Sequence, residues 1–255
     1  MTAPSALVAD IIPSSVVDGP GNRFVVFLQG CSFNCLACHN PQTIAKRPPG
    51  RAEDREVEQE GPSWVGVDEI LGQIREAAPF LSGVTVSGGE ATCQWEFVDA
   101  LFRRLADDPS TAGLSRLIDT NGDADHEVWA RLAATMDGAM VDLKALDPEI
   151  HRLLTGREND RVLASIVELA SLGRLTEVRL LLIPGVNDDP VLLDDTAEFL
   201  LALDPVPPVV LLGFRHEGAR AIARRFPEAT AEHLERAAAV LTGAGLDVVS
   251  IRPLP

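Results

Sequence analysis

Residues 23–41 read RFVVFLQGCSFNCLACHNP, an apolar run that leads directly into three closely spaced cysteines. The run 24–28 is short, rich in Val and Phe and bounded by Gly30, which is typical of a buried strand. Runs of the same kind recur along the chain. We predict the further strands at 84–87, 116–119, 139–143, 177–183 and 209–213, with 248–251 as a terminal addition.

Longer stretches with helical periodicity separate these strands. They cover 67–78, 94–106, 126–133, 162–172, 190–203 and 230–242, with helix-start residues at Asp68, Asp125, Asp147 and 187–189. Six strand–helix pairs in a row indicate an α/β fold around a parallel sheet. Since no linker or repeat interrupts them, we predict one domain over 1–255 that forms a partial (β/α)6 TIM-like barrel. An open doubly wound sheet is the alternative.

The composition excludes several classes of protein. Of 255 residues, 46% are hydrophobic and 24% charged, which excludes a disordered chain, a collagen and a disulfide miniprotein. The net charge of −16 disfavours a nucleic-acid partner. No apolar run reaches the roughly 18 residues of a membrane helix, and residues 1–17 lack the pattern of a secretory signal. We therefore expect a cytoplasmic protein with reduced thiols and no membrane partner.

Three of the four cysteines, Cys31, Cys35 and Cys38, form a C-x3-C-x2-C pattern. Thiolates are soft ligands that bind zinc or iron–sulfur clusters. A structural zinc site would need a fourth ligand, either His39 or the distant Cys93. A [4Fe–4S] cluster held by three thiolates leaves one iron open to a small molecule. The spacing alone leaves both interpretations open.

Polar clusters follow four of the predicted strands, at 88–90, 119–121, 142–144 and 215–217. Active sites of barrels and open α/β sheets lie at the carboxyl ends of the strands, so we expect these clusters and the cysteine loop to converge. Strand alternation places Asp142 and Lys144 on one face.

The C-x3-C-x2-C pattern after a strand resembles the signature of the radical S-adenosylmethionine (SAM) superfamily. Several further segments resemble one branch of it, the activating enzymes of glycyl-radical enzymes. These segments are VDGPGNRFVVFLQGC (17–31), CHNPQT (38–43), GVTVSGGE (83–90), LIDTNG (117–122), VDLK (141–144), HRLLTGREN (151–159) and LLIPGVNDDP (181–190).

The resemblance implies a complete set of site residues. Cys31, Cys35 and Cys38 would hold a [4Fe–4S] cluster, and Lys144 would pair with the SAM carboxylate as part of the catalytic set. Asp119, Thr120 and Asp142 would frame a monovalent cation, Na⁺ or K⁺. The partner's glycine loop would dock at Asp18 and Gly19. The residues expected to bind SAM are Ala37, Cys38, His39, Gly88, Gly89, Glu90, Asp119, Asp142, Leu143, Lys144, Arg179 and His216.

Two features depart from the common pattern of this branch. Ala37 stands where the residue before the third cysteine is usually aromatic, and the ferredoxin-like insertion of many activases is absent, so we expect one cluster. The segments 93–97 and 211–220 resemble those of one activase subfamily.

The implied activity is reductive cleavage of SAM to a 5′-deoxyadenosyl radical, which takes an α-hydrogen from a glycine of a partner glycyl-radical enzyme. A flavodoxin or ferredoxin-type protein would donate the electron, and the chain would be a monomer. One alternative is a radical SAM enzyme that acts on a small molecule, like the 7-carboxy-7-deazaguanine synthases, or an activase of anaerobic ribonucleotide reductase. The other is a zinc- or cluster-binding module without catalysis.

The remaining features receive structural interpretations. The charged, Pro- and Gly-rich stretch 45–66 is predicted to be a mobile loop or lid beside the cluster, and a solvated spacer without a role is the alternative. Cys93 is predicted to be a small apolar filler. We predict that three histidines lie at the surface and that three tryptophans pack into the structure: His126, His151 and His233, and Trp64, Trp95 and Trp129.

Overall fold

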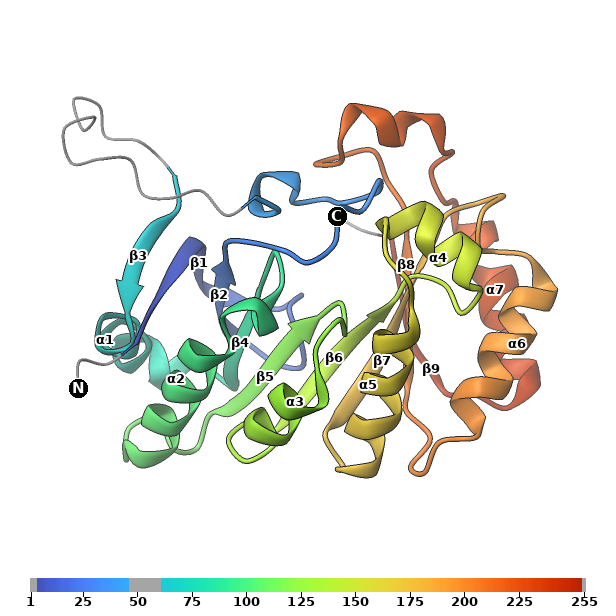
Figure 1. Cartoon of the computed structure of the whole chain (residues 1–255). Coiled ribbons are helices and arrows are strands. Elements are labelled where there is room, and N and C mark those ends of the chain that lie inside the picture. Colours follow the sequence, from blue (N-terminus) through green and yellow to red (C-terminus); the bar gives the residue numbers. More distant parts are fainter. Residues whose placement is uncertain (1–3, 46–60, 254–255) are drawn as a thin grey trace. The chain divides into compact units, whose positions relative to one another are not determined.

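The computed structural model describes residues 4–45 and 61–253 (Figure 1). By their contacts the residues fall into two compact units. Unit 1 comprises Met1–Ser32, Gln42–Asp119 and Ala130–Asp137. Unit 2 comprises Phe33–Pro41, Thr120–Trp129 and Gly138–Pro255. The prediction of a single domain stays a prediction. Most of the predicted mobile loop, residues 46–60, lies outside the described residues.

The strands of unit 1 follow the order β3-β1-β2-β4-β5. β2, β4 and β5 are parallel, whereas β1 pairs antiparallel with both β2 and β3.

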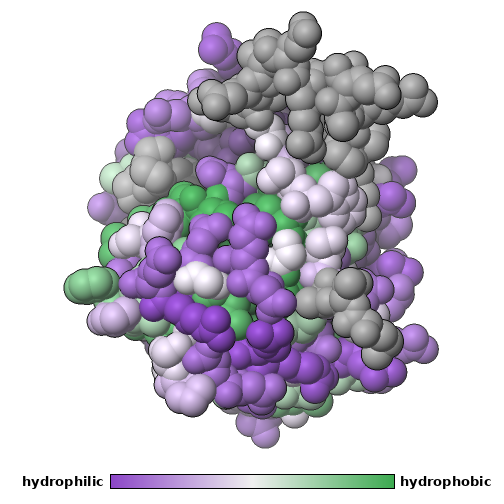
Figure 2. Space-filling model, turned by 90° about the vertical axis from the view of Figure 1, so that its left-hand side faces the viewer, coloured by the Kyte–Doolittle hydropathy of each residue, from purple (hydrophilic) through white to green (hydrophobic). Residues whose placement is uncertain are grey.

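Figure 2 shows the side of the molecule at the left of Figure 1, where hydrophilic residues surround smaller hydrophobic areas. The strands are β1 (Ser5–Ser15), β2 (Arg23–Leu28), β3 (Ser63–Gly66), β4 (Gly83–Gly88) and β5 (Ser115–Thr120).

Neither β1 nor β3 was predicted from the sequence. Two irregularities in the pairing of β1 with β2, at Val8/Asp10 and Ile12/Ser15, break the alternation that identifies a strand. β3 has only four residues at the end of the charged stretch 45–66, so the prediction of a loop was wrong for 63–66. The local pattern of both strands is weak, and pairing with β2 and with each other defines them.

Helices α1 (Val67–Ala77) and α2 (Trp95–Asp107) each bury one apolar face. The prediction that Asp68 begins α1 was wrong, because the residue before the helix is Gly66 and Asp68 lies in its first turn. Unit 1 also contains three short 3₁₀ segments among its described residues: η1 (Pro41–Thr43), which begins at the unit boundary, η3 (Ala78–Phe80) and η4 (Ala91–Gln94).

Unit 2 contains four parallel strands in the order β6-β7-β8-β9. They are β6 (Gly138–Leu143), β7 (Leu175–Leu182), β8 (Val209–Gly213) and β9 (Val248–Pro253). The helical segments are α4 (Pro148–Thr155), α5 (Asp160–Ser171), α6 (Pro190–Leu201), η5 (Ala221–Arg225) and α7 (Ala231–Ala244), and α3 (His126–Leu132) begins in unit 2 and ends in unit 1.

Two predicted helix starts are confirmed by side-chain caps. Asp147 accepts a hydrogen bond from the Ile150 amide, and Asp189 accepts one from the Val191 amide. α4 itself was not predicted as an element, although its start was. A buried chain of hydrogen bonds also fixes α5, because Trp129 Nε1 donates to Ser165 Oγ at 2.7 Å and that hydroxyl donates to the Gly122 carbonyl at 2.7 Å.

The predicted exposure of the histidines and tryptophans is correct for some of these residues and wrong for others. His126 is exposed, as predicted, but His151 is 0% exposed, so its assignment to the surface was wrong. Trp129 is buried, whereas Trp64 is 53% exposed and does not pack into the core. None of the helices within residues 4–45 and 61–253 is long and apolar enough to cross a bilayer.

Candidate functional site

Each predicted polar cluster lies at the carboxyl end of its own strand. Gly88 is the last residue of β4, and Asp119 and Leu143 lie at the ends of β5 and β6. Arg215 follows the end of β8 by two residues. The prediction that each cluster follows its own strand is therefore confirmed, and their convergence on one site stays a prediction.

Gly88 and Gly89 in unit 1 let two backbone segments cross in close contact. Gly88 has a φ of +119°, and a Cβ atom there would lie 2.2 Å from the Leu28 amide nitrogen. A Cβ on Gly89 would lie 2.3 Å from the Gly30 carbonyl oxygen. The Glu90 amide donates to that same carbonyl at 2.8 Å. The two glycines thus allow β4 to end against the segment that leads into Cys31.

Hydrogen bonds within unit 1 also fix the backbone of Cys31 and the carboxylates of Glu90 and Asp119. The Cys31 amide donates to the Ile44 carbonyl at 2.9 Å. Glu90 is 1% exposed, and its Oε1 accepts from the amide and the hydroxyl of Thr92. Asp119 Oδ2 accepts from Ser87 Oγ at 2.9 Å. Unit 1 therefore fixes the backbone of Cys31 and the carboxylates of Glu90 and Asp119 close to the ends of its parallel strands.

The remaining two cysteines of the motif belong to unit 2, where α4 supports their loop. The Asn34 amide donates to the Thr155 carbonyl at 3.1 Å, and the Leu36 amide donates to the Leu154 carbonyl at 2.8 Å. These carbonyls are in the last turn of α4, where the helix leaves them without a partner. The end of the helix thus anchors the loop that carries Cys35.

Arg220 holds the same loop from the segment after β8. Its Nη1 donates to Asn34 Oδ1 at 2.8 Å, and its Nη2 donates to the Asn34 carbonyl at 2.7 Å and to the Cys35 carbonyl. In the sequence, the segment 211–220 indicated only a resemblance, and this role of Arg220 was not predicted. The one indication of this role in the sequence was that an arginine follows shortly after a predicted strand.

Asp142 and Lys144 form the ion pair that the alternation of β6 predicts. Lys144 Nζ lies 2.6 Å from Asp142 Oδ2, and the Lys144 side chain is 17% exposed. Burial acts to lower the pKa of Lys144, but Asp142 and the nearby Cys35 outweigh it and raise that pKa above its usual value. Lys144 therefore carries a positive charge beside the two cysteines of unit 2.

The two thiols of unit 2 resist ionisation as the chain stands. Burial raises the pKa of Cys35 to about 11, although Lys144 acts to lower it, and burial also raises the pKa of Cys38. A metal centre binds the thiolate forms, so binding would release these protons. The Lys144 charge offsets part of the cost of forming two thiolates.

Arg179 lies next to Asp142 in the sheet register. Its Nε lies 2.6 Å from Glu177 Oε1, and its Nη2 lies 2.9 Å from Met140 Sδ. Arg179 is 8% exposed. The β6 and β7 strands thus carry two ion pairs side by side, Asp142–Lys144 and Glu177–Arg179. Of the second pair, only Arg179 was predicted as a site residue from the sequence.

Phe214 organises the aromatic part of unit 2. Its ring meets the rings of His39 and His216 edge to face, at centroid distances of 6.2 and 5.6 Å. His216 Nε2 lies 2.8 Å from the Phe226 carbonyl oxygen, so this ring already has a partner within the protein. Ala37 is 6% exposed and packs in the same apolar cluster as Phe214.

Asn187 is a second residue whose role was not predicted from the sequence. Its side-chain amide donates to the carbonyls of Lys144, at 2.9 Å, and Leu181, at 2.7 Å, while its Oδ1 accepts from the Ile183 amide. One side chain thus joins the ends of β6 and β7. The segment 187–189 was considered only as the start of α6.

Other predicted site residues lie apart from these clusters within their own units. Asp18 and Gly19 precede β2 and lie toward its amino end, and Thr85 of β4 donates to the Asp18 carbonyl at 2.8 Å. Thr120 of unit 2 is buried, and its hydroxyl accepts from the Gly122 amide at 3.0 Å. No contact tests their predicted roles in partner and cation binding.

The donor set fits an iron–sulfur cluster. The chain offers three thiols within eight residues, and His39 Nε2 is buried with no hydrogen-bond partner in the described part of the chain. Burial lowers the pKa of His39, so the ring is neutral. Within residues 4–45 and 61–253, no three His, Cys, Asp or Glu side chains already stand in a metal-ligand arrangement.

Comparisons with known proteins agree with this chemistry. The model of the radical SAM superfamily matches residues 25–200. The pyruvate formate-lyase-activating enzyme of Staphylococcus epidermidis is 32% identical over 212 residues, which cover 79% of this chain and 78% of the relative. The chain therefore belongs to the radical SAM superfamily. Within it, the chain is a member of the group of pyruvate formate-lyase-activating enzymes, which makes it an enzyme rather than a binding module.

Solved structures support the fold. A domain of the pyruvate-formate lyase-activating enzyme from Bacteroides vulgatus has a TM-score of 0.56 and 26% identity, and the match covers 66% of this chain and 98% of that domain. A radical SAM methyltransferase from Sphaerobacter thermophilus has a TM-score of 0.66 and 20% identity over 91% of this chain and 66% of its own, which shows the fold alone. The prediction of a partial TIM-like barrel of the radical SAM type is confirmed.

Proposed function

We propose that this enzyme installs a glycyl radical in a partner protein, using a [4Fe–4S] cluster bound by Cys31, Cys35 and Cys38. The observation that supports this most directly is the grouping in unit 2 of Cys35 and Cys38 with the Asp142–Lys144 ion pair. The radical SAM family implies both the cluster and SAM as cofactors. When bound, the cluster supplies one electron that cleaves SAM into methionine and a 5′-deoxyadenosyl radical, which takes an α-hydrogen from a glycine of the partner.

The chain's own residues bind and orient the cofactors. Lys144 pairs with the carboxylate of SAM, and its bond to Asp142 at 2.6 Å keeps its charged end in place beforehand. A side chain that is already oriented loses little conformational freedom on binding. Glu90 accepts from the ammonium group of SAM, because a buried carboxylate at the end of β4 suits a charged ammonium donor.

The apolar and cationic parts of SAM have their own proposed contacts. Ala37 and His216 lie on the apolar cluster around Phe214, which suits an adenine ring. Leu143, Arg179, His39, Gly88 and Gly89 complete the SAM-binding residues. Asp119, Thr120 and Asp142 hold a monovalent cation, Na⁺ or K⁺, since oxygen donors suit hard cations.

The partner and the electron source are also part of the proposal. Asp18 and Gly19 contact the glycine-bearing segment of a glycyl-radical enzyme, and a flavodoxin or ferredoxin-type protein donates the electron. We place the reaction in the cytoplasm, where the four cysteines would keep the thiol form they have in the described residues. The chain acts as a monomer.

Anaerobic reconstitution with iron and sulfide, followed by SAM and dithionite, tests the proposal. We expect about four irons per chain and formation of 5′-deoxyadenosine, both of which require Cys35. Adding pyruvate formate-lyase of Staphylococcus epidermidis should then give a glycyl radical by electron paramagnetic resonance. The Cys35→Ala variant is the control for cluster-dependent chemistry. Bound zinc, or a cluster that does not cleave SAM, would contradict the proposal, and SAM cleavage without a protein radical would favour a small-molecule substrate.

A further inference from the structure

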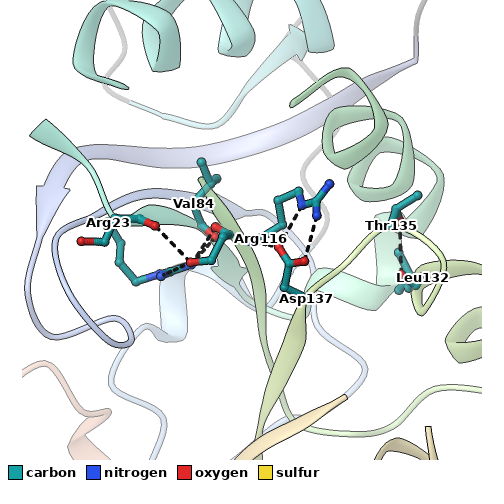
Figure 3. Close-up of polar contacts among 8 residues, drawn as sticks. Arg23, Val84, Arg116, Leu132, Thr135 and Asp137 are labelled. Atoms are coloured by element: carbon teal, nitrogen blue, oxygen red, sulfur yellow. Dashed lines mark hydrogen bonds and ion pairs between the residues drawn. The ribbon is translucent and has the colours of Figure 1, made fainter. Parts of the chain in front are cut away.

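Arg23 is an arginine with 0% exposure that no proposed step of the reaction uses. Fully buried arginines are rare unless they are paired, because burial of a charge is costly. Arg23 makes five hydrogen bonds, and every acceptor is an uncharged oxygen. Burial lowers the pKa of Arg23 to about 10, so it is still charged at neutral pH. Figure 3 shows this side chain and, separately, the Arg116–Asp137 ion pair of the same unit.

Two of the hydrogen bonds of Arg23 lead to the loop formed by residues 16–20, here called the 16–20 loop. Arg23 Nη1 donates to the Pro20 carbonyl at 3.2 Å. Arg23 Nε donates to Thr85 Oγ1 at 2.6 Å, and this hydroxyl donates onward to the Asp18 carbonyl at 2.8 Å. Arg23 and Thr85 together fix two backbone carbonyls of the loop.

The base of the 16–20 loop is fixed as well. Gly21 has a φ of +77°, and a Cβ atom there would lie 2.4 Å from Ser82 Oγ. Asn22 Nδ2 donates to the Phe80 carbonyl at 2.8 Å, and the Ser82 amide donates to the Asn22 carbonyl at 2.7 Å. The chain on the carboxyl side of the loop therefore has little freedom to move.

The side chains on the 16–20 loop contrast with this rigid backbone. Val16 is 73% exposed and Val17 is 54% exposed, and Phe80, whose carbonyl holds Asn22, is 79% exposed. A backbone that is held from inside, with apolar side chains toward solvent, has the character of a preorganised binding loop. Preorganisation favours binding because the loop has less conformational entropy to lose.

We propose that Arg23 and Thr85 are positioning residues that hold the 16–20 loop in the conformation that binds the partner protein. This inference rests on the proposed function, since it assigns the loop to the glycyl-radical enzyme. Arg23 and Thr85 act through the carbonyls of Pro20 and Asp18, not by touching SAM or the reacting atoms. The neutral acceptors around Arg23 suit this role, because a carboxylate partner would draw its donors away from the loop.

Thr85→Val is the sharpest test, because it keeps the shape of the side chain and removes the hydroxyl that joins Arg23 to Asp18. The reconstituted enzyme should form 5′-deoxyadenosine without partner at the wild-type rate. Its KM for pyruvate formate-lyase of Staphylococcus epidermidis in glycyl-radical formation should rise by about fivefold or more, the effect of leaving buried polar groups unpaired. Thr85→Ser, which keeps the hydroxyl, should restore the wild-type KM.

Arg23→Lys should have the same effect on KM. Its control in unit 1 is Arg104→Lys, because Arg104 lies on α2 and its ion pair with Asp68 involves none of the groups around Arg23. Amide hydrogen exchange of Asp18, Gly19, Gly21 and Asn22 should speed up in Thr85→Val and Arg23→Lys and stay unchanged in Arg104→Lys. This measurement detects the loop directly, even where a variant folds less well.

Three outcomes would overturn the inference: an unchanged KM, unchanged exchange at the loop, or an equal loss of partner-free SAM cleavage. The last would mean that Arg23 supports the whole unit. A wild-type enzyme that cleaves SAM but forms no protein radical would instead overturn the proposed function, and with it the assignment of the loop to a partner.

Discussion

Removal of the Arg220 side chain should loosen the loop that carries Cys35. Arg220 makes three hydrogen bonds to this loop, two to Asn34 at 2.8 and 2.7 Å and one to the Cys35 carbonyl. For a partly exposed guanidinium, each bond contributes about 0.5–1 kcal/mol. The Arg220→Ala variant should therefore lose about 1.5–3 kcal/mol of local stability, which makes loop opening about 10- to 150-fold more frequent.

Amide hydrogen exchange measures this opening directly. In the iron-free chain, the Leu36 amide is held by the Leu154 carbonyl at 2.8 Å, so its exchange reports loop opening. We expect exchange at 33–38 to speed up by the factor given above in Arg220→Ala. After reconstitution, the variant should also lose iron to a chelator faster than the wild type. Arg220→Lys should give an intermediate result, because lysine keeps the charge but loses the planar array of donors.

The matched control is Arg236→Ala, since Arg236 is exposed and its ion pair lies within α7. It should change neither exchange at 33–38 nor iron release. If Arg220→Ala also left both quantities at wild-type values, the last turn of α4 would hold the loop alone, and the reasoning would be refuted.

Three further variants test other parts of the structure. Ser165→Ala removes two buried hydrogen bonds and should lower the free energy of unfolding in urea by about 2–4 kcal/mol. Ser171→Ala in the same helix removes an exposed one and should cost less than about 0.5 kcal/mol. Burial lowers the pKa of His151 from 6.5, so stability should fall as the pH drops below 6.5, and His151→Leu should flatten that fall in urea titrations between about pH 5 and 8. Gly89→Ala places a Cβ 2.3 Å from the Gly30 carbonyl oxygen and should cost about 1–3 kcal/mol and reduce the iron retained after reconstitution.

Each of these three predictions would be contradicted by a definite result. Equal losses for Ser165→Ala and Ser171→Ala would mean that the buried chain of hydrogen bonds contributes nothing special. The sign of the pH effect follows from burial, because the unfolded chain binds the His151 proton more readily than the folded chain. An unchanged pH slope in His151→Leu would assign the acid sensitivity to other groups. Wild-type stability and iron content in Gly89→Ala would show that the crossing of β4 and the cysteine segment can relax.

The parts of the site that the sequence predicted have a local origin. Asp142 and Lys144 are two residues apart on a strand, so alternation alone places them on one face, and the structure joins them at 2.6 Å. Asp189 begins α6 for the same kind of reason, because the side chain of a residue before a helix caps the nearby amides. The cysteine motif and the glycine pair likewise lie within short segments with a recognisable composition.

The parts that the sequence did not predict depend on contacts between distant residues. Arg220 and Cys35 are 185 positions apart, and no local pattern indicates that one would hold the other. Arg23 would be expected at the surface, yet the sheet buries it among the oxygens of Thr85, Val84 and Ser115. His151 has the polar character of a surface residue, but α4 buries it against Phe33, at a centroid distance of 5.5 Å.

The sequence by itself determined the alternation of strands and helices, the cysteine motif and the polar residue types at the strand ends, because each depends on the order of neighbouring residues. Only the tertiary structure decided which strands flank β2, what holds the cysteine loop and which charges are buried. These features depend on the exclusion of water and on hydrogen bonds between distant segments, and both exist only once the chain has folded.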